Sequence, residues 1–424
     1  MDPTVVRAVQ RAVAAFLVTF VLGSGVVYAI GRATGDEAAD GSTPTSSAGP
    51  GDGDGTGGGT PATTPLAYLV WMPGGFPEAP VAELATIPRV RRTTVATAGV
   101  GWLTRSVDAD GEVVDAPASP FAVPIEITGV DPAAFASFLP TGEARDLLRE
   151  LSADQVILSA SSAKRRGLGP GATLEFDPGG FEVEVAGVFP DVLVGGYEAV
   201  VVRSTAERLG AGLPRYALLK MRKGATPTAV RVTEDVVELM ERAVRDPAVE
   251  VRAPGETELL RAHDRSPTPT TLKRRFGEFT AYAASSTALA IDDTWVEDNI
   301  EAREVPRLGT ITCHRKTSFL LRKAMSEVAI DIDLGDFGGC FDETWRPDMP
   351  QGTLPAALWG ASVRLSVGLN RPGFPPFLDD RIVETMTAWG FRWAGNDAYP
   401  DGSLFEYLQP PPRDDADATP SPTD

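Results

Sequence analysis

The residues best suited to metal binding or cross-linking are few. The chain of 424 residues has two cysteines, Cys313 and Cys340, and two histidines, of which His314 directly follows Cys313. Thiolates and imidazoles bind zinc, but a structural zinc site needs four ligands and no fourth is evident. His263 lies in the polar segment RAHDR, and we expect it to be exposed. The alternative chemistry is a Cys313–Cys340 disulfide, which forms in an oxidising compartment.

The N-terminal residues indicate that compartment. Residues 12–31, AVAAFLVTFVLGSGVVYAIG, contain no acidic or basic side chain. At 1.5 Å per residue, such a helix is about 30 Å long, the thickness of a bilayer core. Arginines precede it and acids follow it, which predicts a cytoplasmic stub at 1–11 and an extracytoplasmic bulk. A cleaved signal peptide is the alternative, although its apolar core usually has about 7–15 residues. An extracytoplasmic location favours the disulfide over a metal site.

Composition divides the rest of the chain. Residues 32–65 are mostly Gly, Ser, Thr, Pro, Ala and Asp, which predicts a flexible linker, and residues 409–424 should be a disordered tail. Between them we predict folded domains at 66–260 and 271–408. The formal net charge of −19 argues against nucleic acid as a partner, because nucleic acid requires a basic face.

Residues 66–260 combine short strands with a few helices, which predicts an α+β domain. FEVEVAGVF alternates, with Phe181, Val183 and Val185 on one face. DPAAF predicts a helix start with proline in the first turn, and TAVRVTEDVVELMERAV has helical spacing as far as Ala243. No paired catalytic groups stand out. We interpret the basic trio 164–166 as a solvated helix end.

The segments VILSASSAKRRGLGPGATLEF and FEVEVAGVFPD, together with PIEITGVDPAAFASFLP, form a distinctive series in this domain. The series resembles the extracytoplasmic core domain of ABC-transporter permeases of the macrolide-exporter and lipoprotein-release type. The resemblance covers most of residues 66–250. Those permeases have several membrane helices and this chain shows one, so no transport pore can be built from it alone. The resemblance implies a domain that works by contact rather than by catalysis.

The second domain carries CHR, GGC, WG, WGF and FEY in that order. This series resembles the VanY-like zinc D,D-carboxypeptidase and L-alanoyl-D-glutamate peptidase family, which cuts peptidoglycan stem peptides. The resemblance implies a VanY/Hedgehog-like α+β peptidase fold. In that family three protein ligands hold zinc, the zinc activates a water molecule, and a carboxylate moves the proton.

The positions that match the family's zinc ligands carry other residue types here. The family pattern is S-x-H-x-W-G-x-A-x-D-x-N, followed by D-x-x-H-F-E. With Trp359 and Gly360 in register, the acid position is Asp401 and the three ligand positions are Ala357, Arg364 and Leu404. These three side chains cannot bind zinc. We therefore expect no metal, no other cofactor and no catalytic residue, although zinc is what the family uses.

The same alignment predicts a ligand groove made of five residues: Arg346, Trp359, Arg364, Asp401 and Glu406. We hypothesise that the guanidinium of Arg364 replaces the positive charge of the metal and pairs with Asp401 or Glu406. The alternative is an arginine that points into solvent. The alternating aromatic residues of the WGFRW segment are interpreted as core or groove wall: Trp389, Phe391 and Trp393.

These observations predict a single-pass protein of the bacterial cell membrane, with most of the chain extracytoplasmic. Its peptidase-like domain would be non-catalytic and would bind a peptidoglycan stem peptide or an envelope protein. The alternative is an active peptidoglycan peptidase of the D-alanyl-D-alanine carboxypeptidase type with a displaced metal site. A third possibility is a partner subunit of an ABC-type assembly.

Overall fold

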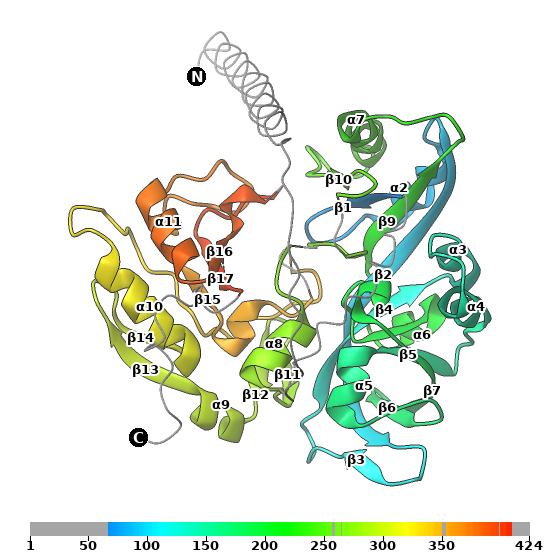
Figure 1. Cartoon of the computed structure of the whole chain (residues 1–424), viewed down its shortest axis with the longest axis horizontal. Helices are drawn as coiled ribbons and strands as arrows, with labels where there is room; N and C mark the ends of the chain where they lie inside the picture. The colour runs from blue at the N-terminus through cyan, green and yellow to red at the C-terminus, as the bar shows by residue number, and fades with distance from the viewer. Residues whose placement is uncertain (1–66, 257–258, 264, 350–352, 398, 409–424) are drawn as a thin grey trace, which may run out of the picture. The chain divides into compact units, whose positions relative to one another are not determined.

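The computed structural model describes residues 67–408 apart from 257–258, 264, 350–352 and 398 (Figure 1). The cytoplasmic stub, membrane helix, linker and tail expected from the sequence therefore lie outside the described residues. No helix within the described part of the chain combines the length and the hydropathy that crossing a bilayer requires. All described residues belong to one compact unit, and they combine helices with a large sheet, as the α+β prediction states.

Ten strands form the large sheet. In chain order they are β1 (Tyr68–Trp71), β2 (Val90–Val107), β3 (Val113–Asp115), β4 (Val123–Val130), β5 (Gln155–Ser159), β6 (Thr173–Asp177), β7 (Phe181–Phe189), β8 (Ala199–Val202), β9 (Pro214–Met221) and β10 (Glu250–Arg252). Their spatial order is β10-β1-β9-β2-β4-β8-β5-β7-β6, and β3 pairs with β2. The β4–β8 and β5–β7 pairs are parallel and the other pairs are antiparallel.

Part of this sheet closes on itself. Strand β6 pairs with β2 as well as with β7, so β2, β4, β8, β5, β7 and β6 form a ring. Strand β2 is 18 residues long, which allows its middle to pair with β4 and its end with β6. A Cβ atom on Gly101 would lie 2.3 Å from the end of the Ile127 side chain, so a larger residue there would force Ile127 to shift. One buried apolar cluster draws side chains from all six strands of the ring.

Short helices cover this sheet: α2 (Glu78–Ala82), η1 (Leu84–Thr86), α3 (Pro132–Ala136), α4 (Glu143–Glu150), α5 (Ala160–Arg166), η2 (Asp191–Val194), α6 (Arg203–Arg208) and α7 (Ala229–Met240). Asp131 caps α3 by accepting from the amide of Ala134, which confirms the predicted helix start. Helix α7 ends at Met240, and Ala243 is exposed beyond it, so the predicted helix was too long. The predicted apolar face of β7 is confirmed, because Val183 and Val185 are buried.

The second half of the described chain is made of small sheets and short to medium-length helices. Its elements are α8 (Pro269–Phe276), β11 (Ala281–Ser285), β12 (Ala288–Ile291), α9 (Asp293–Asn299), β13 (Ile300–Val305), β14 (Gly309–His314), α10 (Arg315–Glu327), η3 (Ala356–Trp359), β15 (Ser362–Arg364), α11 (Asp380–Ala388), β16 (Phe391–Trp393), η4 (Ala394–Asn396) and β17 (Leu404–Tyr407). Strands β11–β12 and β13–β14 form hairpins, and the third sheet has the order β15-β17-β16.

One apolar core holds this half together. It joins the inner faces of α8, α10 and α11 to the small sheets and includes Trp389 and Phe391, with Trp393 packed against it. The prediction that these aromatic residues serve the core is therefore confirmed. Val100 of β2 belongs to the same core, and an isolated bridge pairs Ala122 with Ala281. The large sheet and the second half thus share packed side chains and backbone hydrogen bonds.

Candidate ligand site around Arg364

The three-stranded sheet places three of the predicted site residues, Arg364, Leu404 and Glu406, on one face. Arg364 of β15 is the cross-strand partner of Leu404 of β17, and Ser362 and Arg392 both pair with Glu406. Directly opposed residues of antiparallel strands point to the same face. The opposite face carries Phe405, which is fully buried in the apolar core. One face is therefore apolar, and the other carries two arginines.

Arg364 is held by an acid and a hydroxyl. Its Nη1 donates to Asp401 Oδ2 at 2.7 Å and to Ser403 Oγ at 2.9 Å, so the predicted Arg364–Asp401 pair is present. The Asp401 side chain is 4% exposed, whereas that of Arg364 is 30% exposed. No described residue accepts from Nε or Nη2 of Arg364. The guanidinium is thus fixed on one side and retains N–H donors for a further acceptor.

Glu406 pairs with a different arginine. It is 3% exposed, and Nε of Arg392 donates to its Oε2 at 3.1 Å. Arg392 also donates to Asp397 at 2.6 Å and to Ser266 at 3.0 Å. Burial raises the pKa of Glu406, although Arg392 opposes this shift. The alternative pairing of Arg364 with Glu406 is therefore wrong, because Arg392 lies directly across from Glu406 on the neighbouring strand.

The positions that the peptidase resemblance equates with zinc ligands do not fit a metal. Ala357 lies in η3, and Arg364 and Leu404 are cross-strand neighbours. A methyl group, a guanidinium and an isobutyl group offer no lone pair to a cation. Within the described residues, no group of three or more His, Cys, Asp or Glu side chains is arranged to hold a metal ion.

Two of the five predicted groove residues do not join the others. Trp359 is fully buried in the apolar core, where its Nε1 donates to Gly277 O at 3.0 Å. It is a core residue, and tryptophan supplies the large apolar area that such a position buries. Arg346 is exposed, and its charged neighbour is Asp348 at 3.6 Å. Of the remaining three, only Arg364 reaches the surface to an appreciable extent.

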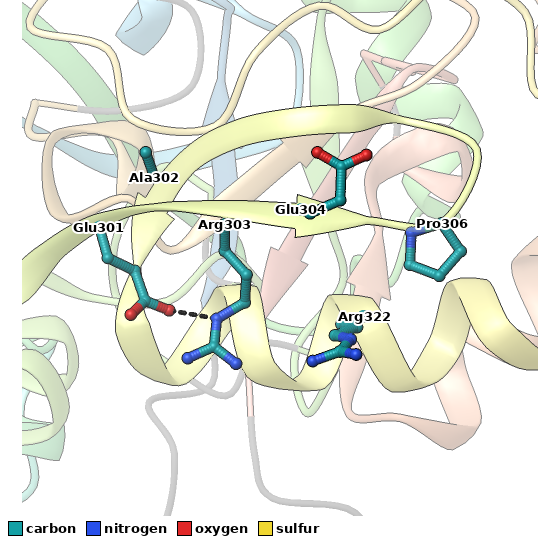
Figure 2. Close-up of a pocket in the computed structure, with 6 residues that line it drawn as sticks. All are labelled: Glu301, Ala302, Arg303, Glu304, Pro306 and Arg322. Atoms are coloured by element: carbon teal, nitrogen blue, oxygen red, sulfur yellow. Dashed lines mark hydrogen bonds and ion pairs between the residues drawn. The ribbon is translucent and has the colours of Figure 1, made fainter.

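A depression of about 490 Å³ lies between β13 and α10 (Figure 2). Glu301, Ala302, Arg303, Glu304, Pro306 and Arg322 line it. Arg303 Nε lies 2.5 Å from Glu301 Oε1, so these two charges satisfy each other. The sequence did not single out this place, and its lining offers no nucleophile or metal-binding set.

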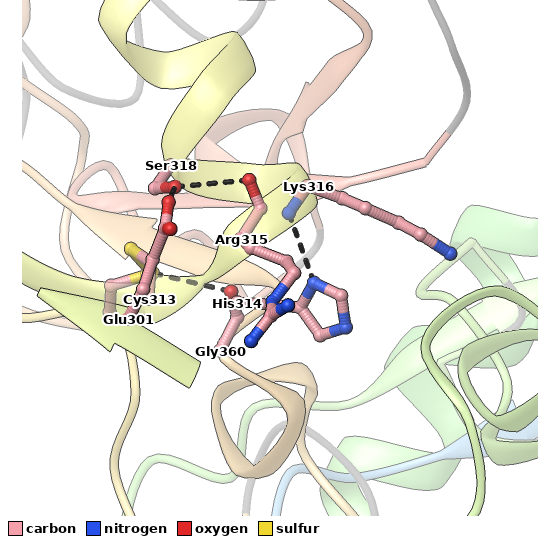
Figure 3. Close-up of a disulfide and its surroundings, with 8 residues drawn as sticks. Glu301, Cys313, His314, Arg315, Lys316, Ser318 and Gly360 are labelled. Atoms are coloured by element: carbon pink, nitrogen blue, oxygen red, sulfur yellow. Dashed lines mark hydrogen bonds between the residues drawn. A yellow bond between two sulfur atoms is a disulfide. The ribbon is translucent and has the colours of Figure 1, made fainter. Parts of the chain in front are cut away.

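The cysteines and His314 form no metal site. Cys313 and Cys340 are joined by a disulfide with Cα atoms 5.3 Å apart, which confirms the prediction (Figure 3). A disulfide sulfur is not a thiolate ligand. His314 is buried, and its Nδ1 accepts from the amide of Lys316 at 3.1 Å. Burial lowers the pKa of His314 to about 4, so this side chain is neutral at pH 7.

His263 and Arg166 are less exposed than the sequence predicts. His263 is half-buried, with its ring 4.1 Å from that of Trp71, and burial lowers its pKa well below the usual value. Arg166 is 5% exposed because its guanidinium lies 2.6 Å from Glu278 and 3.4 Å from Asp115. The interpretation of 164–166 as a fully solvated helix end is therefore wrong for Arg166.

Arg166 belongs to a buried ion cluster that the sequence did not reveal, made of Arg166, Glu198, Lys273 and Glu278. Lys273 is 1% exposed, and its Nζ lies 2.8 Å from both Glu198 Oε1 and Glu278 Oε1. The same Nζ donates to Pro124 O at 2.6 Å. Because Glu198 follows η2 and Lys273 is on α8, the cluster connects the large sheet to the second half of the chain.

A second buried pair strengthens this connection. Arg261 donates to both carboxylate oxygens of Glu126, at 2.8 and 3.0 Å, and Glu126 is fully buried on β4. Thr353 of the second half also donates to Glu126. Arg215 of β9 donates to Met349 O at 3.1 Å. These contacts fix the second half against the sheet by charge-assisted hydrogen bonds.

Comparison with known proteins gives structural neighbours only. No protein-family model matches this sequence, and no curated protein matches it. The periplasmic region of MacB from Actinobacillus actinomycetemcomitans is similar, with 14% identity over 46% of this chain and 91% of that chain, and a TM-score of 0.31. The extracellular domain of the noncanonic ABC-type transporter YknZ from Gram-positive bacteria is also similar, with 14% identity over 44% and 98% of the two chains, and a TM-score of 0.30.

The first of these neighbours is a periplasmic region, and the second is the extracellular domain of a transporter. The resemblance of residues 271–408 to VanY-like peptidases is not shown by these comparisons and stays a prediction. Similarity at this level says nothing about function, which has to be argued from the chain's own residues.

Proposed function

We propose that this chain is a membrane-anchored extracytoplasmic protein whose second half is a non-catalytic binding module. The guanidinium of Arg364 is its ligand-binding group. The observation that carries this proposal is the one-sided fixation of Arg364: Asp401 and Ser403 occupy Nη1, while Nε and Nη2 have no acceptor among the described residues. An arginine that is positioned in advance and partly exposed binds an acceptor with little further loss of side-chain entropy.

The chemistry of the free donors favours a carboxylate. Nε and Nη2 of one guanidinium are parallel donors that match the two oxygens of a carboxylate. Peptides supply such a group at their C-terminus. The resemblance of this half to stem-peptide enzymes, with ligand positions occupied by Ala357, Arg364 and Leu404, supports a cell-wall peptide that is bound but not cut. An envelope protein with an exposed C-terminal carboxylate is the other partner that fits this chemistry.

The alternative function is a working peptidoglycan peptidase with a displaced metal site. The side chains at the expected ligand positions do not support it, since none of the three offers a lone pair. A peptidase would contain about one zinc ion per chain and would lose activity with a chelator.

The two functions are separated by one set of measurements on the full-length chain in phosphatidylcholine nanodiscs. We expect calorimetry to detect binding of a stem peptide with a free C-terminus and no binding of the same peptide with an amidated C-terminus. Arg364→Lys keeps the charge but loses the bidentate geometry. We therefore expect it to weaken binding by about tenfold or more, since a hydrogen bond to a charged group contributes about 1.5–3 kcal/mol.

Arg346→Lys is the matched control. Arg346 is in the same half and is exposed, and its charged neighbour is Asp348 rather than Asp401. We expect its peptide affinity to equal that of the wild type. Equal affinities in the two variants would contradict the role of Arg364. Stoichiometric zinc together with chelator-sensitive cleavage of the peptide would establish the alternative.

A further inference from the structure

The segment that follows β15 exposes large apolar side chains on an ordered loop. Residues 366–379 have the sequence SVGLNRPGFPPFLD. Leu369 is 63% exposed, Phe374 62% and Phe377 72%. Large apolar residues grouped in this way on a soluble surface mark a site of contact with another apolar surface.

This loop is held rigidly from inside. Asn370 is 2% exposed, and its Nδ2 donates to Ser366 O at 3.0 Å and to Phe377 O at 2.9 Å. Its Oδ1 accepts from the amide of Phe377 at 2.6 Å. The amide of Gly373 donates to Pro400 O at 2.7 Å, which fastens the loop to the segment before Asp401. The aromatic side chains are therefore exposed by a fixed backbone, and binding them costs little additional ordering.

A fourth exposed apolar residue belongs to a segment that forms an ion pair with α11, the helix that follows this loop. Ile330 is 92% exposed in the segment after α10. Its neighbour Asp331 lies 3.4 Å from Arg381, which is in the first turn of α11 directly after the loop. We name the three exposed apolar residues of this loop, Leu369, Phe374 and Phe377, the apolar tip. Arg371, inside the loop, is exposed and has no carboxylate partner among the described residues.

We propose that the apolar tip inserts into the surface of the lipid bilayer that carries the protein. This inference rests on the membrane anchor of the proposed function but not on the role of Arg364. A flexible linker of the length predicted for residues 32–65 has a root-mean-square length of about 30–35 Å. A folded unit of about 340 residues has a radius of gyration of about 20 Å. Every face of the unit can thus reach the bilayer, and the bilayer is the apolar surface present at the highest local concentration.

The net charge of the chain determines which lipid headgroups the apolar tip can approach. The net charge of −19 repels an anionic surface, so the apolar tip should insert into zwitterionic membranes, where burial of apolar area supplies the driving force. Phenylalanine and leucine side chains at a loop tip enter the region between headgroups and acyl chains. Arg371 can then contact lipid phosphate groups while its stem remains in the apolar layer.

Bromine-labelled lipids test this proposal, because bromine on an acyl chain quenches only tryptophan that enters that layer. The full-length Phe377→Trp chain is reconstituted in phosphatidylcholine vesicles with and without bromine. The tryptophan emission of the wild type is subtracted from that of the variant, so that the native tryptophans do not contribute to the difference. The matched control is Val230→Trp, since Val230 is 67% exposed on α7 in the other half. Flotation of the vesicles first verifies that the chain is anchored.

We expect a loss of emission with brominated lipid for Phe377→Trp and no loss for Val230→Trp. Adding Phe374→Ser and Leu369→Ser to Phe377→Trp should abolish the loss. No quenching at position 377 in a chain that floats with the vesicles would overturn the inference while leaving the anchor intact. Equal quenching at both positions would also overturn it.

Discussion

Replacing Lys273 by methionine should lower the free energy of unfolding by about 3–5 kcal/mol, which is typical of a broken buried ion pair. The side chain is 1% exposed, and its ammonium contacts Pro124 O, Glu198 and Glu278 within 2.9 Å. An ammonium has three N–H donors, and all of them are used here. Methionine has a similar volume, so the loss comes from the charge rather than from packing.

The predicted cost arises mainly at Glu198. This carboxylate is 1% exposed, and without Lys273 it retains the amide of Glu126 as a donor at 2.9 Å but no cation. Glu278 is less affected because Arg166 remains 2.6 Å away. The double variant Lys273→Met/Glu198→Gln removes both charges and keeps an acceptor for the Glu126 amide. It should therefore recover a large part of the lost stability.

Urea unfolding followed by circular dichroism measures these differences. Arg149→Met is the matched control, because Arg149 forms an exposed pair with Asp146 at a similar distance of 2.9 Å. An exposed pair contributes about 0–1 kcal/mol, so this variant should unfold close to the wild type. Should Lys273→Met be as stable as Arg149→Met, the reasoning about the buried ion cluster would be refuted.

The same cluster predicts a dependence on pH. Burial alone would raise the pKa of Glu278, but Lys273 and Arg166 lower it to about 2. A carboxyl with a lowered pKa stabilises the fold above its unfolded pKa of about 4.3. This stabilisation is lost as pH falls from about 4.3 to about 2. Removing Lys273 raises the pKa of Glu278, so the acid-unfolding midpoint of Lys273→Met should move to higher pH than that of the wild type.

Two further predictions concern the second half of the chain. Removing the disulfide with Cys313→Ala and Cys340→Ala should cost about 3–4 kcal/mol, because the two residues are 27 positions apart and the unfolded chain gains that loop entropy. Urea unfolding of the variant measures this cost, and a stability equal to that of the wild type would show that the cross-link is dispensable. Arg364→Ala should cost about 1–3 kcal/mol, because the Asp401 side chain is 4% exposed and loses its cation. An unchanged melting temperature would contradict that pairing, and adding Asp401→Asn should reduce the cost.

The elements that sequence predicts correctly depend on local patterns. Strand β7 follows from alternation, and α3 follows from Asp131 and Pro132, which are four and three residues before its first buried residue. The disulfide follows from the compartment and from the presence of two cysteines only. The Arg364–Asp401 pair was one of two pairings predicted, because the motif alignment puts Arg364 at a metal-ligand position and Asp401 at the acid position. In each case the signal lies within a few residues or in a motif of known order.

The buried ions could not be predicted because their partners are distant in sequence. Glu198 and Lys273 are 75 residues apart, and Glu126 and Thr353 are 227 apart. One signal was available: every residue of β4 is buried, and Glu126 is the one charged residue of this mostly apolar strand. A carboxylate with apolar neighbours on both sides of a strand requires a cation, which could have indicated a partner. The ring of strands was equally hidden, since only the length of β2 hints that it pairs twice.

The place of β1 in the sheet determines how the chain would bear a mechanical load. β1 is the first strand of the described chain. It lies between β9, with which it forms four register pairs, and β10, with which it forms three. Interstrand hydrogen bonds run across the strand direction. A pull applied just before β1, in the direction of the strand, strains these bonds together rather than one after another. The first strand of the described chain therefore lies where such a load is resisted by two neighbouring strands at once.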